Sequence, residues 1–551
     1  MILRRRQKEA SATANGLDEE RDRRPSVPPN RLSRREFLAI STAACASAFL
    51  KPTSVLAAQG ARRFHCCLAS KVITERPELL DLIREAGVSD VWLASFFFGH
   101  WYEKPEDLKP VIAMVEAKGL GWNIINVPLG HPGDALGDAT GATPLAPPTR
   151  WRMAERPDGT KYSGTSLHPP AIQENVDAIR RIRALKPGTI FLDDDFRLAQ
   201  GPGVIGGCFC DWHKKEFLEK HGFSQSHWEE LLADVEARNF SPVLRNWVDH
   251  TCDQLTACFK AQQAAAPEVA LGNMIMYLGA EKAGIRLADY ADTPFRVGEM
   301  MFNDKDFGRL SGKTGELFSC LFHRRYARPD LAYSETTAFP ADQLSAKNMA
   351  AKLAVSTICD VRNTMYMSGM TPFPETHWET LVPAMRKQAT FHEVIRGHTP
   401  QGPFKHYWGE ASRYVGNDNP FSIFLASGIP FEVVDTLSAD GWTFLSDQDA
   451  RYCQAKGNCF CRTGLKDIPK SIRAIPDDLD ALWKVKAEMV GSGLNVPYVI
   501  DEKPVVCAWY PTARKVFLWN LAETKEDFQL QVADQKIPLS IGGLDSVLVS
   551  V

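Results

Sequence analysis

Regular alternation of short apolar segments with amphipathic segments, over residues 64–366, is the feature that most restricts the fold of this chain. The apolar segments are four to six residues long and predict strands; the longer segments between them carry apolar residues at helical spacing. Strict alternation of this kind favours a parallel sheet. The eight predicted strands are 64–68, 90–93, 122–127, 188–192, 269–274, 295–300, 331–335 and 363–366.

Eight strand–helix units over this length predict a TIM (β/α)8 barrel with insertions. The glycine-rich turn of a dinucleotide-binding fold is missing after the first predicted strand. We therefore expect an α/β chain in which residues 62–401 form a catalytic barrel. A small α/β middle domain is predicted for 402–495, with strands at 420–425 and 431–434. Period-2 segments predict a C-terminal antiparallel β domain at 496–551.

The first 57 residues have the pattern of an export signal. Ser33-Arg34-Arg35-Glu36-Phe37-Leu38 precedes a short apolar run, which ends in small residues at Val55-Leu56-Ala57-Ala58. This order is typical of a twin-arginine (Tat) signal peptide with a long n-region. Cys45 lies inside the apolar run, which argues against a lipoprotein anchor. The sequence predicts a Tat machinery substrate that is periplasmic or secreted.

Charge and hydropathy exclude several classes of partner. Without residues 1–57 the chain keeps 53 basic and 61 acidic residues, a net charge of −8. An acidic product argues against nucleic-acid binding. No later run of about 18 apolar residues predicts a membrane helix, so we expect no stable membrane anchor. The sequence leaves a homo-oligomer open.

Carboxylates follow two of the predicted barrel strands. The strand at 188–192 runs into Asp193-Asp194-Asp195, and the strand at 331–335 ends in Glu335. Strand carboxyl ends meet at one mouth of a barrel, so a substrate bond can lie between these acids. Glycoside hydrolysis needs two such carboxyl groups, one as acid and one as nucleophile or base. Asp194 or Asp195 is the predicted acid, and Asp193 the structural member of the three.

Polar and aromatic residues near the same strand ends are candidates for substrate contact. Aromatic faces stack on sugar C–H surfaces, Arg197 can restrain a neighbouring aspartate, and the remaining side chains can hydrogen-bond hydroxyl groups. The predicted substrate-binding residues are His100, Trp101, His131, His168, Arg197, Tyr277, Glu299 and Asn303.

Cys208, Cys210 and His213 place soft ligands at tight spacing shortly after the three aspartates. Thiolate and imidazole ligands suit zinc. The motif supplies three ligands, and His131 or Asp211 could supply the fourth. A metal beside this loop would be a structural staple, and catalysis itself would need no cofactor.

Together these motifs resemble the clan of retaining barrel glycosidases that includes the family 42 β-galactosidases. The resemblance implies Asp194 or Asp195 as acid/base, Glu335 as nucleophile and a zinc cluster after the acid/base. It also implies an α/β middle domain and a small C-terminal β domain. The chain departs from the family pattern in three places. Asp-Asp-Asp replaces Asn-Glu at strand four, His213 replaces a cysteine, and the middle domain is shorter.

The expected function is an exported glycoside hydrolase acting on a carbohydrate by a two-carboxylate mechanism. Two other readings stay open at this point. One is a non-catalytic carbohydrate-binding protein on a glycosidase-like barrel. The other is a metal-dependent lyase or isomerase that uses the three aspartates as oxygen ligands.

Overall fold

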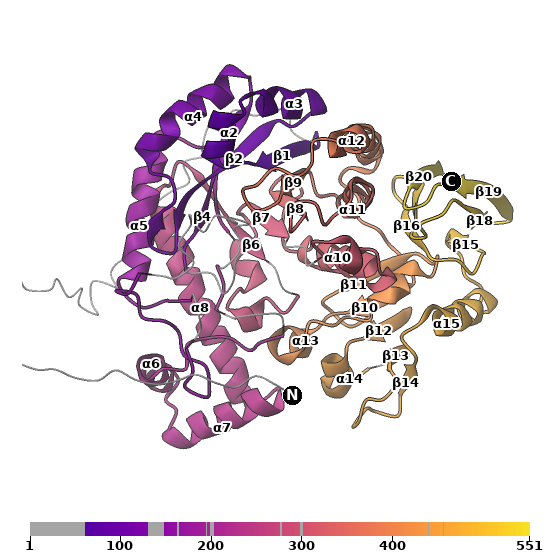
Figure 1. The fold of residues 1–551 in the computed structure, drawn as a ribbon. Coiled ribbons are helices and arrows are strands. Elements are labelled where there is room, and N and C mark those ends of the chain that lie inside the picture. Colours follow the sequence, from indigo (N-terminus) through magenta and orange to yellow (C-terminus); the bar gives the residue numbers. More distant parts are fainter. Residues whose placement is uncertain are drawn as a thin grey trace, which may run out of the picture. The chain divides into compact units, whose positions relative to one another are not determined.

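A closed eight-stranded parallel barrel forms the first part of the structure (Figure 1). The computed structural model describes residues 61–129, 148–161, 165–193, 196–198, 203–275, 278–297, 301–438, 440–455 and 457–551. Pairing of β1 with both β9 and β2 closes the barrel. Its strands are β1 (Arg63–Cys67), β2 (Asp90–Phe97), β4 (Gly121–Val127), β5 (Thr189–Leu192), β6 (Ala270–Ile275), β7 (Phe295–Val297), β8 (Ala332–Thr337) and β9 (Asn363–Met367).

Helices surround the strands and confirm the predicted TIM barrel (Figure 1). The main ring consists of α3 (Glu78–Ala86), α4 (Pro105–Ala117), α5 (Ala171–Ile182), α8 (Pro242–Ala265), α10 (Leu310–His323), α11 (Ala346–Ile358) and α12 (His377–Ile395). Shorter elements are α2 (Ser70–Glu75), β3 (His100–Trp101), η1 (Arg183–Leu185), α6 (Asp211–His221), α7 (Gln225–Ala237), η2 (Glu281–Ala283), η3 (Leu287–Tyr290) and α9 (Asp304–Phe307).

One of the eight predicted strand–helix units is different in the structure. In the described residues between β6 and β7 the chain forms only the 3-10 turns η2 and η3. Helix α13 (Glu410–Val415), from the region after the barrel, packs against η2 at this point. The indole N–H of Trp408 also donates to the carbonyl of Leu278 at 3.2 Å. A later segment of the chain thus covers the place where the ring lacks an α-helix.

A five-stranded parallel sheet follows the barrel, in the order β11-β10-β12-β13-β14. Its elements after α12 are β10 (Phe404–Tyr407), η4 (Ser422–Ala426), β11 (Phe431–Val434), β12 (Trp442–Leu445), α14 (Asp447–Tyr452), β13 (Asn458–Arg462), β14 (Ile472–Ile475) and α15 (Leu479–Gly491). The prediction of a strand at 420–425 is wrong, because η4 occupies this segment. Phe424 and Leu425 are both fully buried, so the segment is apolar on consecutive positions, and such short runs do not distinguish strand from helix.

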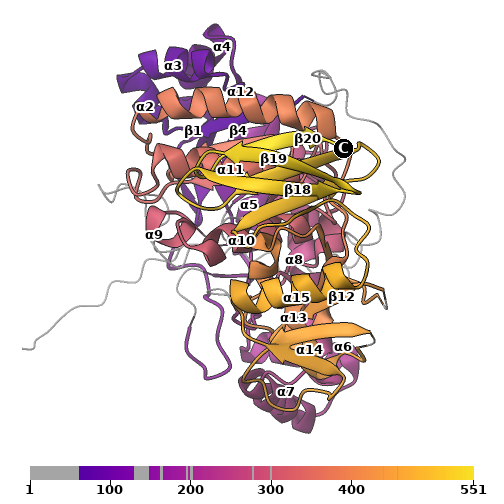
Figure 2. The same cartoon turned by 90° about the vertical axis from the view of Figure 1, so that its right-hand side faces the viewer.

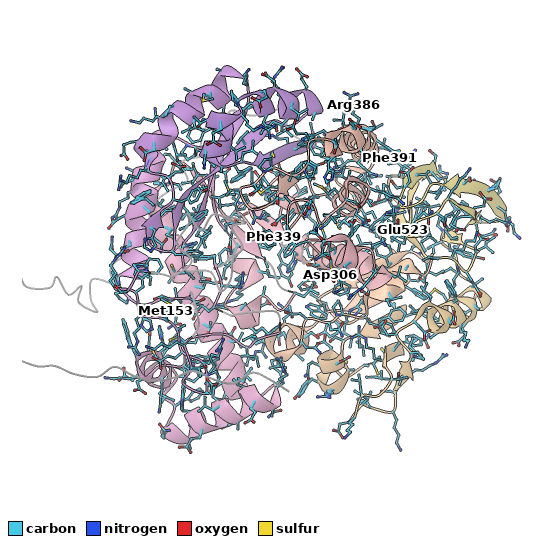
Figure 3. All side chains as sticks on the ribbon, viewed as in Figure 1. Met153, Asp306, Phe339, Arg386, Phe391 and Glu523 are labelled. Atoms are coloured by element: carbon cyan, nitrogen blue, oxygen red, sulfur yellow. The ribbon has the colours of Figure 1, made fainter. Side chains whose placement is uncertain are left out.

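Two three-stranded antiparallel sheets end the chain, as the period-2 pattern predicts. They contain β15 (Tyr498–Val499), β16 (Val505–Tyr510), β17 (Lys515–Asn520), β18 (Glu526–Val532), β19 (Gln535–Ile541) and β20 (Ser546–Ser550). These strands lie beside α11 and α12 (Figure 2). Phe391 of α12 contacts the ring of Phe517 edge-on, and Glu523 pairs with Lys347 at 2.8 Å; Figure 3 labels Phe391 and Glu523.

The predicted domain ranges stay predictions, because residues 54–551 cluster as one compact unit. Among the described residues, no helix combines the length and apolar character that a membrane crossing requires. The predicted signal peptide at 1–57 lies outside the described residues.

Candidate active site and candidate metal centre

Three aromatic rings from different strands fill the middle of the barrel. Trp92 of β2, Phe191 of β5 and Tyr333 of β8 lie with ring centroids 4.8–6.0 Å apart. Side chains two residues further along a strand point to the same face. Asp193 and Glu335 therefore lie one layer closer to the carboxyl ends of the strands, above this aromatic floor.

Arg296 of β7 joins these two carboxylates inside the barrel. Its Nη2 contacts Asp193, and its Nε lies 2.9 Å from Glu335 Oε2. Glu335 also accepts a hydrogen bond from the hydroxyl of Thr337. The exposed fractions of Arg296, Asp193 and Glu335 are 0%, 5% and 3%. Arg296, Asp193 and Glu335 therefore form a buried ion group above the aromatic floor.

Methionine sulfur atoms surround the other side of the Arg296 guanidinium. Its Nη1 donates to Met365 Sδ at 3.1 Å and to Met367 Sδ at 3.5 Å, and Nη2 also contacts Met274. Thioether sulfur is a weak acceptor. The carboxylates of Asp193 and Glu335 are therefore the strong acceptors that Arg296 contacts in this layer.

A second buried ion pair lies behind the barrel wall. Lys352 of α11 contacts Glu316 of α10 at 2.9 Å, and both side chains are almost fully buried. Glu316 accepts from the Met301 amide at 3.1 Å, and Lys352 donates to the Met301 carbonyl at 2.8 Å. Burial raises the pKa of Glu316 to about 7, against the opposing effect of Lys352. This pair fixes both backbone groups of Met301 in the segment after β7.

Glu335 lies within its strand and not at its end, because β8 continues to Thr337. This corrects the predicted end of the strand and places the carboxylate deeper in the barrel. Asp194, Asp195, His131, Tyr277 and Glu299 lie outside the described residues. The candidate acid therefore stays a prediction.

The remaining predicted substrate contacts are at varied positions. Arg197 is buried and lies four residues after Asp193 in the chain. Asn303 caps α9 and accepts from the Asp306 amide at 3.0 Å. Trp101 packs edge-on against Phe96 and lies under the guanidinium of Arg181, 4.3 Å from its ring centroid. His100 precedes Trp101 in β3 and is half-buried.

Arg296 is not among the site residues predicted from the sequence, although its place in a predicted barrel strand indicated a buried charge. Arg296 is the only charged residue in the three-residue strand β7, between Phe295 and Val297. A charged side chain on a barrel strand must find a partner when it is buried. Its position therefore pointed to an acid on another strand, but not to which acid.

The four side chains of a compact cluster are His168, Cys208, Cys210 and His213. Their ligand atoms all lie within 4.8 Å of one another, and all four residues are buried. His168 Nε2 lies 3.5 Å from Cys208 Sγ and 3.8 Å from Cys210 Sγ. Cys210 Sγ lies 3.3 Å from His213 Nδ1. The structure brings His168, a predicted substrate contact, into the predicted metal motif.

The three pair distances of 3.3, 3.5 and 3.8 Å match the edges of a tetrahedral zinc site. Bonds of about 2.3 Å to sulfur and about 2.0 Å to nitrogen give ligand–ligand separations of roughly 3.3–3.8 Å. Hydrogen bonds to Cys210 lower the pKa of its thiol. The bond from Cys208 has the largest effect, and those from His168 and His213 have smaller effects. The amide of Glu155 also donates to Cys208 Sγ at 3.4 Å. Two cysteines and two histidines are a common structural zinc set, so the residues present fit this ion.

No family model matches the sequence, and no curated protein matches it. Solved structures do match the fold. A β-galactosidase from the haloarchaeon Halorubrum lacusprofundi is 11% identical with a TM-score of 0.57, covering 89% of this chain and 99% of its own. A catalytic mutant of a GH42 β-galactosidase from G. stearothermophilus is 10% identical with a TM-score of 0.51, covering 89% and 98%.

An α-L-fucosidase from Paenibacillus thiaminolyticus is also similar, with 10% identity and a TM-score of 0.52. The match covers 89% of this chain and all of the fucosidase chain. At such identities the likeness concerns the fold. The chain is similar in fold to glycoside hydrolases over nearly the whole length of those proteins, as the distant resemblance in the sequence indicates.

Proposed function

We propose that this protein is a glycoside hydrolase with Glu335 as its nucleophile or general base. The observation that carries the proposal is the buried carboxylate of Glu335 inside the barrel, on the carboxyl-end side of the aromatic floor, with Arg296 as its counter-charge. Active sites of TIM barrels lie at this end of the strands. The fold likeness to β-galactosidases and a fucosidase supports a carbohydrate as the substrate.

In this mechanism Glu335 acts in its ionised form, as attack on the anomeric carbon or activation of water requires. Arg296 and Thr337 hold the carboxylate in place before the substrate binds. Asp194 or Asp195 would protonate the leaving oxygen. The separation between that carboxyl and Glu335 decides between a retaining and an inverting outcome.

Turnover of a panel of aryl glycosides tests the proposal. We expect Glu335→Gln to lower kcat by about 10³-fold or more, as for other lost nucleophiles. The fold should survive, because glutamine has the shape of glutamate and Arg296 retains its contact with Asp193. Asp194→Asn and Asp195→Asn identify the acid. Glu432→Gln, in β11, is the matched control. Wild-type turnover by Glu335→Gln would remove Glu335 from the mechanism.

A non-catalytic carbohydrate-binding protein is the second candidate, and one observation favours it. Arg296 contacts Asp193 and Glu335 at once, so the three side chains can form a purely structural ion group. Binding of glycans without turnover of any aryl glycoside would select this function. The contact between Arg296 and Asp193 argues against the lyase reading, because a cation already faces one of the three proposed oxygen ligands.

We also propose that His168, Cys208, Cys210 and His213 bind one structural zinc ion. His168 takes the place of the fourth ligand that the motif lacked. The ion would connect the segment before α5 to the start of α6 and would hold the loop after β5 near the mouth. Metal analysis of the purified protein should give one zinc per chain. Cys208→Ser should lose it, whereas Cys252→Ser, a buried cysteine outside the cluster, should retain it; zinc retained by Cys208→Ser would contradict the assignment.

We propose export through the Tat pathway, on the basis of Arg34 and Arg35 and the apolar run after them. Replacing both arginines with lysine should retain the full-length precursor inside the cell. Fractionation of cells that express the two forms measures this. Equal export of both forms would contradict a twin-arginine signal.

A further inference from the structure

A separate cavity lies in the C-terminal β domain, at one end of its two packed sheets. Its volume is about 430 Å³, within the size range of small-ligand sites. Three connections line it: the segment from α15 to β15, the β16–β17 turn and the β18–β19 turn. The residues that matter for recognition are Asn495, Tyr498, Trp509, Pro511, Arg514 and Gln531.

Trp509 lines the cavity with its aromatic side chain. It is half-buried and packs against the apolar core that the two sheets enclose. Its carbonyl accepts from the Gln401 amide at 2.9 Å, which fixes the end of β16. A rigid, half-exposed indole at a cavity presents a flat apolar face to a ligand.

Planar polar groups share the cavity with this ring. Arg514 is exposed in a tight turn in which its amide donates to Pro511 at 3.1 Å and its Nε donates to Val551 at 3.1 Å. Asn495 adds a side-chain amide, and Gln531, whose Nε2 donates to the Ala533 carbonyl at 2.5 Å, adds its amide oxygen. A guanidinium and amides can donate to neighbouring hydroxyl groups in a fixed plane. Among the lining residues none has a carboxylate side chain, which disfavours a metal ion or a basic peptide.

The cavity lies away from the candidate active site. Tyr510, directly before the β16–β17 turn, donates its hydroxyl to the carbonyl of Ile358 at 3.0 Å. Ile358 ends α11, which leads back to the start of β9. This side of the barrel is opposite to the carboxyl ends of the strands, where Glu335 lies. A ligand in the cavity would not approach Glu335 directly.

We propose that this cavity is a glycan-binding site that anchors the protein to a polysaccharide independently of the barrel site. Trp509 would stack on the C–H face of a sugar ring, and Arg514 with the two amides would bind its hydroxyl groups. The inference goes beyond the proposed hydrolysis and does not depend on it, because binding here needs no turnover.

Native gel electrophoresis through soluble polysaccharides tests this site. The probes are galactan, arabinogalactan, xylan, galactomannan and β-glucan, each cast in a separate gel. The parent protein is the full chain with Glu335→Gln, which cannot consume the probe. We expect at least one polysaccharide to retard it, and Trp509→Leu to weaken the retardation at least about tenfold. Leucine retains apolar packing against the sheets but removes the ring face.

Arg514→Asn is the second variant, because asparagine tolerates the positive φ of 53° at this position. It should also weaken retardation, with an unchanged thermal transition. Tyr452→Ala, which removes an exposed aromatic ring elsewhere, should bind like the parent. The inference is overturned if no polysaccharide retards the parent, or if both cavity variants bind like it. Aryl glycoside turnover is scored separately, so a failure of the proposed hydrolysis leaves this result interpretable.

Discussion

Two buried charge networks in this protein differ in how their charges balance. In the barrel, Arg296 faces both Asp193 and Glu335. Where the middle region meets the barrel, each base has one acid: Lys282 pairs with Asp418, and Arg413 pairs with Glu281. Amides of Gly279 and Gly203 also donate to Asp418, at 2.8 and 3.0 Å. In the first network one base contacts two acids, and in the second each base contacts one acid.

The difference separates a site from a structural contact. A buried pair of one acid and one base can hold two docked regions together. Two buried carboxylates that share one base have strongly perturbed electrostatics, and such groups cluster at functional sites. Burial alone would rank Lys282 and Arg296 equally. The sharing of one base by two acids selects Arg296, Asp193 and Glu335 as the candidate site.

Replacing each base with methionine tests this comparison and should give the largest effect. Arg296→Met removes the base that contacts both buried carboxylates. Loss of one partner of a buried pair costs about 3–5 kcal/mol, and this variant should lie at or above the upper end. Urea unfolding measures the loss.

Lys282→Met is the matched variant for the same measurement. Asp418 keeps the two glycine amides, so we expect a smaller loss of about 3 kcal/mol. Turnover per folded molecule should stay at the wild-type value for Lys282→Met and should fall strongly for Arg296→Met. Equal losses of stability and of turnover in the two variants would remove the distinction between the networks.

A smaller effect is expected from His406, a neutral polar group in the same docking region. Its ring is fully buried against Phe318 and Trp408, and its Nε2 accepts from the Phe421 amide at 3.1 Å. Burial lowers the pKa of His406 to about 3. The folded state therefore resists protonation, and this contribution to stability is complete above the ordinary pKa near 6.5. It is lost as the pH falls from there toward 3.

The loss from His406 should reach about 1 kcal/mol at pH 5.5 relative to pH 7.5. His406→Gln retains an acceptor for the Phe421 amide and cannot be protonated in this range. Urea midpoints of the two proteins at both pH values give the difference. A variant with the same pH dependence as the wild type would show that other groups cause it.

Local patterns in the sequence were sufficient for the barrel and for the C-terminal sheets. Apolar runs of four to six residues indicate the strands, and the helical spacing of apolar residues between them indicates the helices. The same signal failed at 420–425, where consecutive apolar residues form the 3-10 helix η4. It also gave no sign that the ring lacks an α-helix after β6, because α13 supplies that cover from about 130 residues later in the chain.

The sequence by itself determined the parallel barrel, the Cys208–His213 motif and Glu335 as a barrel acid, since each depends on residues close together in the chain. Only the tertiary structure decided the partners of these residues. Arg296 lies 103 residues from Asp193, and His168 lies 40 residues from Cys208. Periodicity fixes which face of a strand a side chain occupies, but only closure of the barrel determines which side chains meet inside it.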